Sequence, residues 1–319
     1  MAPQYAPLPA ADPPAADPPA ADPSPADPPA ADPPAADPPA SALAALLPPD
    51  VDPATGRGLR HEAAGIVWHG VVWGRLGRGD LANAAFERVN EPTLLPWIAA
   101  ERGRLLRELG GHAAAEALEG PALAIATDPV DRAMLHLSMA ADAVGRGDDA
   151  VAERRLRAAR EVLEVTAEPG PRADRQWLRA SWVAIEIALL RGGDTEVDGW
   201  SHRCTDDSLP RRHGDPSRCG PVGLPQLDAA GGLQLPAAYT AGSRFHLAKG
   251  LLFAGVVRGE VRLLDLALDH APPALWWAVQ FARAAAGVTG AAAAGERARA
   301  AIVPLPTVSS LRGHTPPHR

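Results

Sequence analysis

The chain has 319 residues, with 31 basic and 38 acidic side chains and a formal charge of −7. Residues 1–50 contain seven Asp and no Lys or Arg, so the net charge lies there and the remainder is neutral. A neutral body exerts little long-range attraction on nucleic-acid phosphates or anionic lipids. No apolar run reaches the roughly 18 residues of a membrane span. We therefore expect neither nucleic-acid nor membrane partners.

The chain also lacks signs of export. Its first ten residues, MAPQYAPLPA, have neither the basic nor the apolar region of a secretory signal. Two cysteines are too few for a disulfide framework. We expect a cytoplasmic protein.

Residues 1–56 form an Ala/Asp/Pro-rich segment built largely from the repeat ADPPA. Proline removes backbone donors and disfavours helix in the residue before it, so this segment is predicted to be a disordered, polyproline-like tail. Its five-residue period does not match the three residues per turn of polyproline, so the Asp side chains spiral around the chain. We interpret the tail as a solvated spacer. Residues 303–319 are also predicted to be a disordered tail.

A helical pattern begins after this tail, and its clearest unit is Asp128–Leu163. Asp128 is an N-cap before Pro129, and Asp148 is a second N-cap. The turn between the two predicted helices contains Gly145 and Gly147, which suit a left-handed backbone. The apolar stripe of the first helix is Ala133, Leu137, Ala140, Ala141 and Val144. That of the second is Ala152, Leu156, Ala159 and Leu163. The unit is therefore predicted to be an antiparallel helix hairpin.

Similar junctions recur along the chain, at Gly79, Gly111, Gly147, Gly193 and Gly259. Stacked hairpins share a core that no hairpin could bury alone. The sequence thus predicts an all-α solenoid of four or five stacked antiparallel helix hairpins. Residues 57–194 form its first part, and residues 243–302 form the C-terminal repeats and cap.

The Asp128–Leu163 unit resembles a tetratricopeptide repeat, and the chain is similar to the alanine- and arginine-rich repeat proteins of actinobacteria. The residues that carry the resemblance are Met139, Ala140, Gly147, Asp148, Ala152, Leu156 and Ala159. Other units depart from the pattern, with Val72 and Glu186 where small residues belong, Arg88 at an apolar position, and a one-residue slip in the second unit. The resemblance implies a right-handed superhelix with a concave groove. It places His136, Met139 and Ala143 in that groove, where they would contact a partner.

Residues 195–242 interrupt the helical period and are predicted to be a disordered insertion or loop. A structureless stretch of this length is unusual within a compact domain. A true insertion and a local shift of reading frame both account for it. It contains His202, Cys204, His213 and Cys219, which offer zinc ligands, but their spacing matches no common zinc site. We expect no metal site there.

Four arginines crowd the second helix of the clearest unit, among them Arg154 and Arg157. The pairs Glu153–Arg157 and Arg157–Glu161 are four residues apart, as in a solvated helix face with compensating charges. The alternative is that Arg154 and Arg157 bind an acidic peptide, which includes the chain's own Asp-rich tail. Trp182 and Glu186 are also neighbours on one helix, an arrangement that we interpret as structural.

No set of nucleophile and base, phosphate-binding loop or metal-ligand motif is readable in the sequence, so we expect no enzyme activity and no cofactor. The first functional hypothesis is a non-catalytic scaffold that binds a protein or peptide segment in the solenoid groove. The alternative is a regulatory or sensor module acting with a transcription regulator on another chain.

Overall fold

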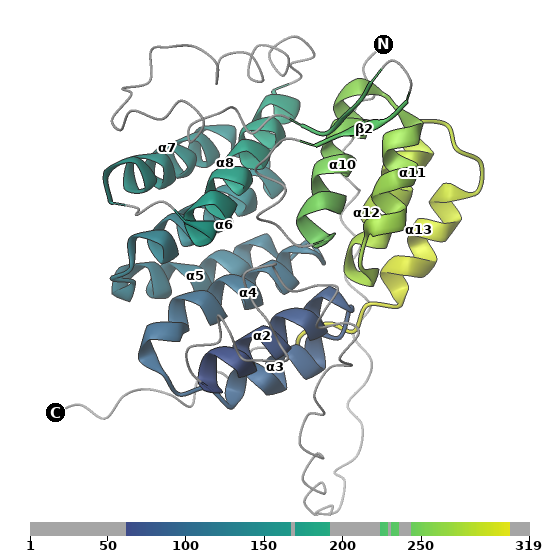
Figure 1. The fold of residues 1–319 in the computed structure, drawn as a ribbon. Coiled ribbons are helices and arrows are strands. Elements are labelled where there is room, and N and C mark those ends of the chain that lie inside the picture. The colour runs from purple at the N-terminus through teal and green to yellow at the C-terminus, as the bar shows by residue number, and fades with distance from the viewer. Residues whose placement is uncertain (1–61, 167–169, 192–223, 229–230, 236–243, 307–319) are drawn as a thin grey trace, which may run out of the picture.

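A computed structural model describes residues 62–166, 170–191, 224–228, 231–235 and 244–306 of the chain. The predicted tail 1–56, the junction at Gly193 and the four His and Cys side chains considered for zinc lie outside these ranges. The described chain is mainly helical (Figure 1), which confirms the all-α prediction. No helix in these ranges combines the length and apolar character needed to cross a bilayer.

Consecutive helices pack as antiparallel hairpins, and the described residues contain five such pairs. The pairs are α2 (Glu62–Arg75) with α3 (Gly79–Glu87), α4 (Leu95–Arg107) with α5 (His112–Ile125), α6 (Pro129–Gly145) with α7 (Asp149–Thr166), α10 (Arg244–Arg258) with α11 (Val261–His270), and α12 (Pro273–Ala285) with α13 (Ala291–Ala300). A short 3-10 helix, η1 (Pro92–Leu94), precedes α4, and α8 (Pro171–Leu190) packs against both α6 and α7.

The hairpin of α6 and α7 confirms the sequence pattern in detail. Asp128 caps α6, its Oδ1 accepting hydrogen bonds from the backbone N–H groups of Val130 (2.7 Å) and Asp131 (3.1 Å). Asp148 Oδ1 caps α7 by accepting from Val151 N–H at 2.9 Å. Both predicted stripes meet in one core cluster, which α8 completes with Ala180, Val183, Ala184 and Ile187. Capping and the apolar stripe therefore determine this hairpin locally.

Left-handed glycines end the first helices, but not always at the predicted residue. Gly147 (φ 77°) and Gly259 (φ 67°) are left-handed as expected. In the first two junctions the left-handed residues are Gly77 (φ 80°) and Gly110 (φ 85°) rather than Gly79 and Gly111. Gly79 is instead the first residue of α3, and Gly111 is the N-cap of α5. The left-handed residue lies one to three residues after the end of a helix, and in the first two junctions the second glycine already begins or caps the next helix.

Gly145 is a further correction, because it is the last helical residue of α6 and is not left-handed. A Cβ atom at Gly145 would collide with the imidazole ring of His112 on α5. Its lack of a side chain therefore serves the packing of α5 on α6.

Two segments predicted to be disordered contain ordered structure within the described ranges. In the segment 195–242, β1 (Gln226–Leu227) pairs antiparallel with β2 (Leu233–Gln234), and Leu224, Leu227 and Leu233 pack against the core of α10–α12. In the segment 303–319, Val303 forms a parallel bridge with Arg78, and Leu305 packs against the core of α2 and α3. Both predictions were drawn from composition alone. Composition does not show that Leu224, Leu227, Leu233 and Leu305 have apolar surfaces of other elements to pack against.

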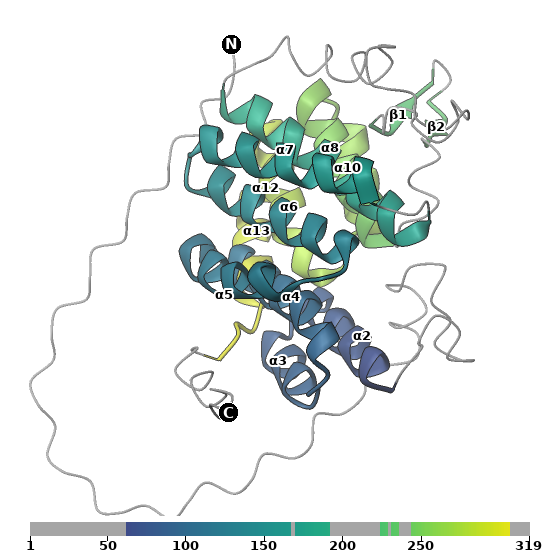
Figure 2. The ribbon, with the colours of Figure 1, turned by 90° about the vertical axis from the view of Figure 1, so that its left-hand side faces the viewer.

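The helices close on one another, and residues just after α13 lie beside the turn between α2 and α3. Helix α6 packs against α4, α5 and α8, α8 packs against α10, and α12 returns to contact α2. Figures 1 and 2 show the first helices of the pairs (α2, α4, α6 and α10), together with α8, gathered around a common interior. This arrangement brings polar side chains from distant parts of the sequence together.

Candidate functional site

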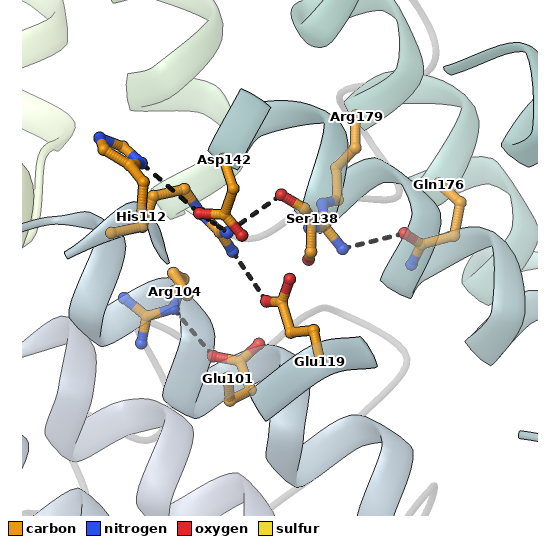
Figure 3. Close-up of polar contacts among 9 residues, drawn as sticks. Glu101, Arg104, His112, Glu119, Ser138, Asp142, Gln176 and Arg179 are labelled. Atoms are coloured by element: carbon orange, nitrogen blue, oxygen red, sulfur yellow. Dashed lines mark hydrogen bonds and ion pairs between the residues drawn. The ribbon is translucent and has the colours of Figure 1, made fainter. Parts of the chain in front are cut away.

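Charged and polar side chains from five helices meet in the interior of the molecule, and we call this set the inner polar cluster. It comprises Arg75 of α2; Glu101, Arg104 and Arg107 of α4 with its C-cap residue Glu108; Ser138 and Asp142 of α6; Arg175, Gln176, Arg179 and Glu186 of α8; and His246 and Lys249 of α10. Figure 3 shows its central part.

Helix α4 supplies the most charges, because its polar residues recur at helical spacing. Arg104 donates to Glu101 Oε2 from Nε (2.8 Å) and to Glu108 Oε1 from Nη1 (2.6 Å), so one guanidinium joins two carboxylates along the helix. Burial alone raises the pKa of Glu101, but Arg104 and Arg75 outweigh it and hold that pKa below its ordinary value. Burial raises the pKa of Glu108, which Arg104 opposes. Arg104 Nη2 is buried and has no hydrogen-bond partner among the described residues.

Arg107 lies between two fully buried carboxylates. Its Nη1 is 2.6 Å from Asp142 Oδ1 on α6, and its Nη2 donates to Glu119 Oε1 on α5 at 3.2 Å. Burial raises the pKa of Glu119 to about 8, with Asp142 adding to the shift and Arg107 opposing it. Burial therefore favours the neutral acid form of Glu119. Gly103 makes room for it, since a Cβ atom there would collide with the Glu119 carboxyl group.

His112 joins the same group from the start of α5. Its Nδ1 is 3.5 Å from Asp142 Oδ1, and its ring lies over Gly145. Arg107 Nη1 also donates to the carbonyl oxygen of Ser138 at 3.0 Å. A network that joins α4, α5 and α6 through buried groups fixes how the second and third hairpins pack.

Arg179 of α8 differs from the other arginines in its partners. Within the described residues, its Nη1 donates to Gln176 Oε1 (3.1 Å) and its Nη2 to Ser138 Oγ (2.9 Å), and both acceptors are neutral. Burial lowers the pKa of Arg179 to about 10, and Arg107 adds to the shift. The side chain is half-buried. Among the described residues, Arg179 therefore forms no ion pair with a carboxylate.

Helix α10 closes the cluster on the side of α2 and α8. Lys249 Nζ is 3.9 Å from Glu186 Oε1 and 5.5 Å from the centre of the Trp182 ring. The guanidinium of Arg75 lies 4.9 Å from the centre of the Phe245 ring. Burial lowers the pKa of Arg75 to about 10 and also lowers the pKa of Lys249.

Water reaches the cluster at several points. The exposed fraction of the side chain is 31% for Lys249, 23% for Glu186 and 17% for Arg104. The cluster is therefore partly accessible to solvent. Its side chains are chiefly hydrogen-bond donors with fixed positive charge, which can bind an anionic group but offer no nucleophile paired with a base. Among the described residues, no group of three or more His, Cys, Asp or Glu is placed to hold a metal ion.

The three groove residues taken from the repeat resemblance do not form an open surface. Met139 is 3% exposed and Ala143 is fully buried, the latter in the core with α7 and α8. His136 is half-buried, and burial together with Arg155 and Arg132 lowers its pKa to about 4. On α6, the residues that belong to the inner polar cluster are Ser138 and Asp142. The family register did not indicate them, because it assumes a groove lined by exposed side chains.

Arg154 and Arg157 are exposed on α7, as predicted for a solvated face. Arg157 Nη2 is 3.8 Å from Glu153 Oε1, and Arg191, the C-cap residue of α8, binds the same Glu153 at 2.6 Å. Arg157 also borders a shallow pocket of about 110 Å³ between α7 and α8. The structure does not bring either arginine to the inner polar cluster.

Sequence reasoning missed most of the inner polar cluster. Each charge lies on a helix at a position that equally suits a solvated face, and Arg104, Glu101 and Glu108 look like ordinary pairs on one helix. One signal was available: Glu119 and Asp142 occur among alanines and other small residues, on helices with few other charges.

Comparisons with models of known families, with curated proteins and with solved structures found no match for this chain.

Proposed function

We propose that the protein is a non-catalytic scaffold that binds an acidic segment of another protein or peptide at the inner polar cluster. The stacked hairpins would form a tetratricopeptide-like array, and the cluster would be its concave face. What supports the proposal is an excess of basic groups in a partly solvent-accessible cluster. Six basic side chains (Arg75, Arg104, Arg107, Arg175, Arg179 and Lys249) share the cluster with four carboxylates (Glu101, Glu108, Asp142 and Glu186) and adjoin Glu119, whose pKa is raised by burial.

The lowered pKa values of Arg75, Arg179 and Lys249 carry this argument further. Burial and neighbouring cations disfavour the positive charge on each of them. A bound carboxylate would favour the charged form, so part of the free energy of desolvation would be recovered on binding. The planar fork of Arg179 suits a carboxylate geometrically. Because the basic side chains are only partly exposed, an acidic side chain rather than the peptide backbone would reach them.

Panning a display library of random 12-residue peptides against the full chain tests the proposal. We expect the retained peptides to be enriched in Asp and Glu, and the enrichment to be lost with Arg179→Gln. Arg179→Lys, which keeps the charge but not the fork, should retain part of it. Circular dichroism and melting temperature show whether each variant is folded.

Arg154→Gln is the matched control, because it removes an exposed arginine of α7. It should leave the enrichment within about twofold of the original chain, as expected for a weakly interacting surface charge. If Arg154→Gln abolished binding and Arg179→Gln did not, the face of α7 would be the binding surface and the inner polar cluster would not. If the folded chain retained no peptide above background, the scaffold function would be wrong.

A further inference from the structure

The residues that follow α13 reach back to the turn between α2 and α3. Val303 N–H donates to the carbonyl oxygen of Gly77 at 2.8 Å, and Gly79 N–H donates to the carbonyl oxygen of Val303 at 2.8 Å. Leu305 packs against the core that contains Val67 and Phe86. We call residues 302–305 the C-terminal strap. It joins the last described helix pair to the first.

The turn is shaped to receive this strap. A Cβ atom at Gly79 would lie 2.7 Å from the oxygen of Val303, 2.9 Å from the nitrogen of Leu305 and 2.9 Å from the carbonyl carbon of Pro304. Those are backbone atoms, which cannot move aside as a flexible side chain could. Gly79 is helical, so the conformation of its own backbone does not require glycine. The close approach of the strap accounts for glycine at this position.

The attachment is small compared with the parts it joins. Two backbone hydrogen bonds and one leucine hold the strap, and Val303 is 36% exposed. Net contributions of about 1 kcal/mol per hydrogen bond make such an attachment reversible. Local openings of this size are common in folded proteins.

The strap is one of four main connections between the C-terminal helices α10–α13 and the other described helices, and the packing of α12 against α2 is another. The third is the packing of Phe253 on α10 against Trp182 and Ile185 of α8. The fourth is the contact of Phe245 with Arg75 and Arg104. The inner polar cluster lies between the third and fourth connections. After release of the strap, α10 would still be held by its contact with α8, by Phe245 and by the packing of α12 against α2, but movement of α10 away from α2 and α4 would become easier.

We propose that the C-terminal strap is a releasable clasp that controls access to the inner polar cluster. This is regulation of the proposed binding site, so its biological meaning rests on the proposed function. Its test does not, because it uses no peptide. Figure 1 shows the strap running from α13 to the end of the molecule that α2 and α3 form.

Lys249 provides the probe, because it is the only lysine in the sequence and belongs to the inner polar cluster. Labelling of the full chain with an N-hydroxysuccinimide acetate, followed by peptide mapping, measures the rate at which Lys249 is acetylated. We expect Gly79→Val, whose side chain collides with the strap, to increase this rate at least fivefold. Gly120→Val on α5 is the matched control, because no atom lies within 4 Å of a Cβ there, and it should leave the rate unchanged.

Val303→Pro is a second way to release the strap, since it removes the N–H donor to Gly77 and leaves every helix intact. Hydrogen exchange at Gly79 and Val303 in the Gly79→Val chain, and at Gly79 in the Val303→Pro chain, reports release directly. Faster exchange together with faster acetylation of Lys249 supports the clasp. Faster exchange with an unchanged acetylation rate in both folded variants would overturn it, and so would unchanged exchange in both, because the strap would then not be releasable.

Discussion

At the scale of single residues, the buried carboxyl group of Glu119 is the most unusual feature. It shares Arg107 with the equally buried Asp142, and His112 lies near the same oxygen of Asp142 as Arg107 does. One guanidinium cannot balance two buried carboxylates, so one of them is best accommodated as the neutral acid. The ordinary pKa of Glu119 is 4.5, and burial raises this pKa to about 8. The junction of α4, α5 and α6 thus depends on one retained proton.

This proton makes stability depend on pH. Between pH 4.5 and 8 the folded chain holds a proton that the unfolded chain has released, so the free energy of unfolding falls as the pH rises, by at most about 1.4 kcal/mol per unit. Glu119→Gln keeps the neutral shape and removes the titration. Between pH 6 and pH 8, the free energy of unfolding measured in urea should fall by at least about 1 kcal/mol more for the original chain than for Glu119→Gln.

The control for this prediction is Glu116→Gln, on the same helix but 31% exposed and paired with Arg146. Between the two pH values, the free energy of unfolding of the Glu116→Gln chain should fall as much as that of the original chain. Equal losses for the original chain and Glu119→Gln would show that Glu119 is already ionised at pH 6.

At the scale of elements, the hairpin of α6 and α7 shows how short sequence signals define a unit. A capping aspartate starts each helix, a left-handed glycine ends the first, and alanines allow the two helices to approach closely. These signals are local in sequence, so they were readable without the fold. Where two glycines stood near one turn, as at Gly77 and Gly79, composition alone did not show which of them was left-handed.

The cap of α7 allows a quantitative check. Asp148→Ala removes the acceptor of the Val151 N–H group and should lower the free energy of unfolding by about 1 kcal/mol. Asp148→Asn retains an oxygen acceptor and should change it by less than half as much. Chemical denaturation of both variants measures the difference, and an equal effect of the two substitutions would argue against a capping role.

At the scale of the whole molecule, the contact between α10 and the helices α2 and α4 closes the interior. Phe245 is 8% exposed, and the guanidinium groups of Arg75 and Arg104 lie 4.9 Å and 6.0 Å from its ring centre. Residues about 140 or more positions apart in the sequence meet here. An aromatic face attracts buried cations that have lost part of their hydration, so this ring helps to hold basic groups in the interior.

Phe245→Leu tests that contact while it keeps an apolar side chain. It should lower the free energy of unfolding by about 1–2 kcal/mol, through loss of the cation–π attraction and some packing. Amide hydrogen exchange should become faster at the end of α2 and the start of α10. Phe281→Leu on α12, whose ring contacts Trp277 instead, should not change exchange in α2. Unchanged exchange in both helices of the Phe245→Leu chain would show that the ring does not couple them.

The sequence by itself determined the helical class, most junctions and the internal design of α6 and α7, because caps, turn glycines and apolar stripes act within a few residues of one another. Only the tertiary structure decided which charges face the interior, that Met139 and Ala143 are buried, and that residues 302–305 bind the turn at Gly77–Gly79. These features depend on the order in which hairpins pack, which a single helix does not encode. A charged residue on one helix has the same local pattern whether it faces water or four other helices.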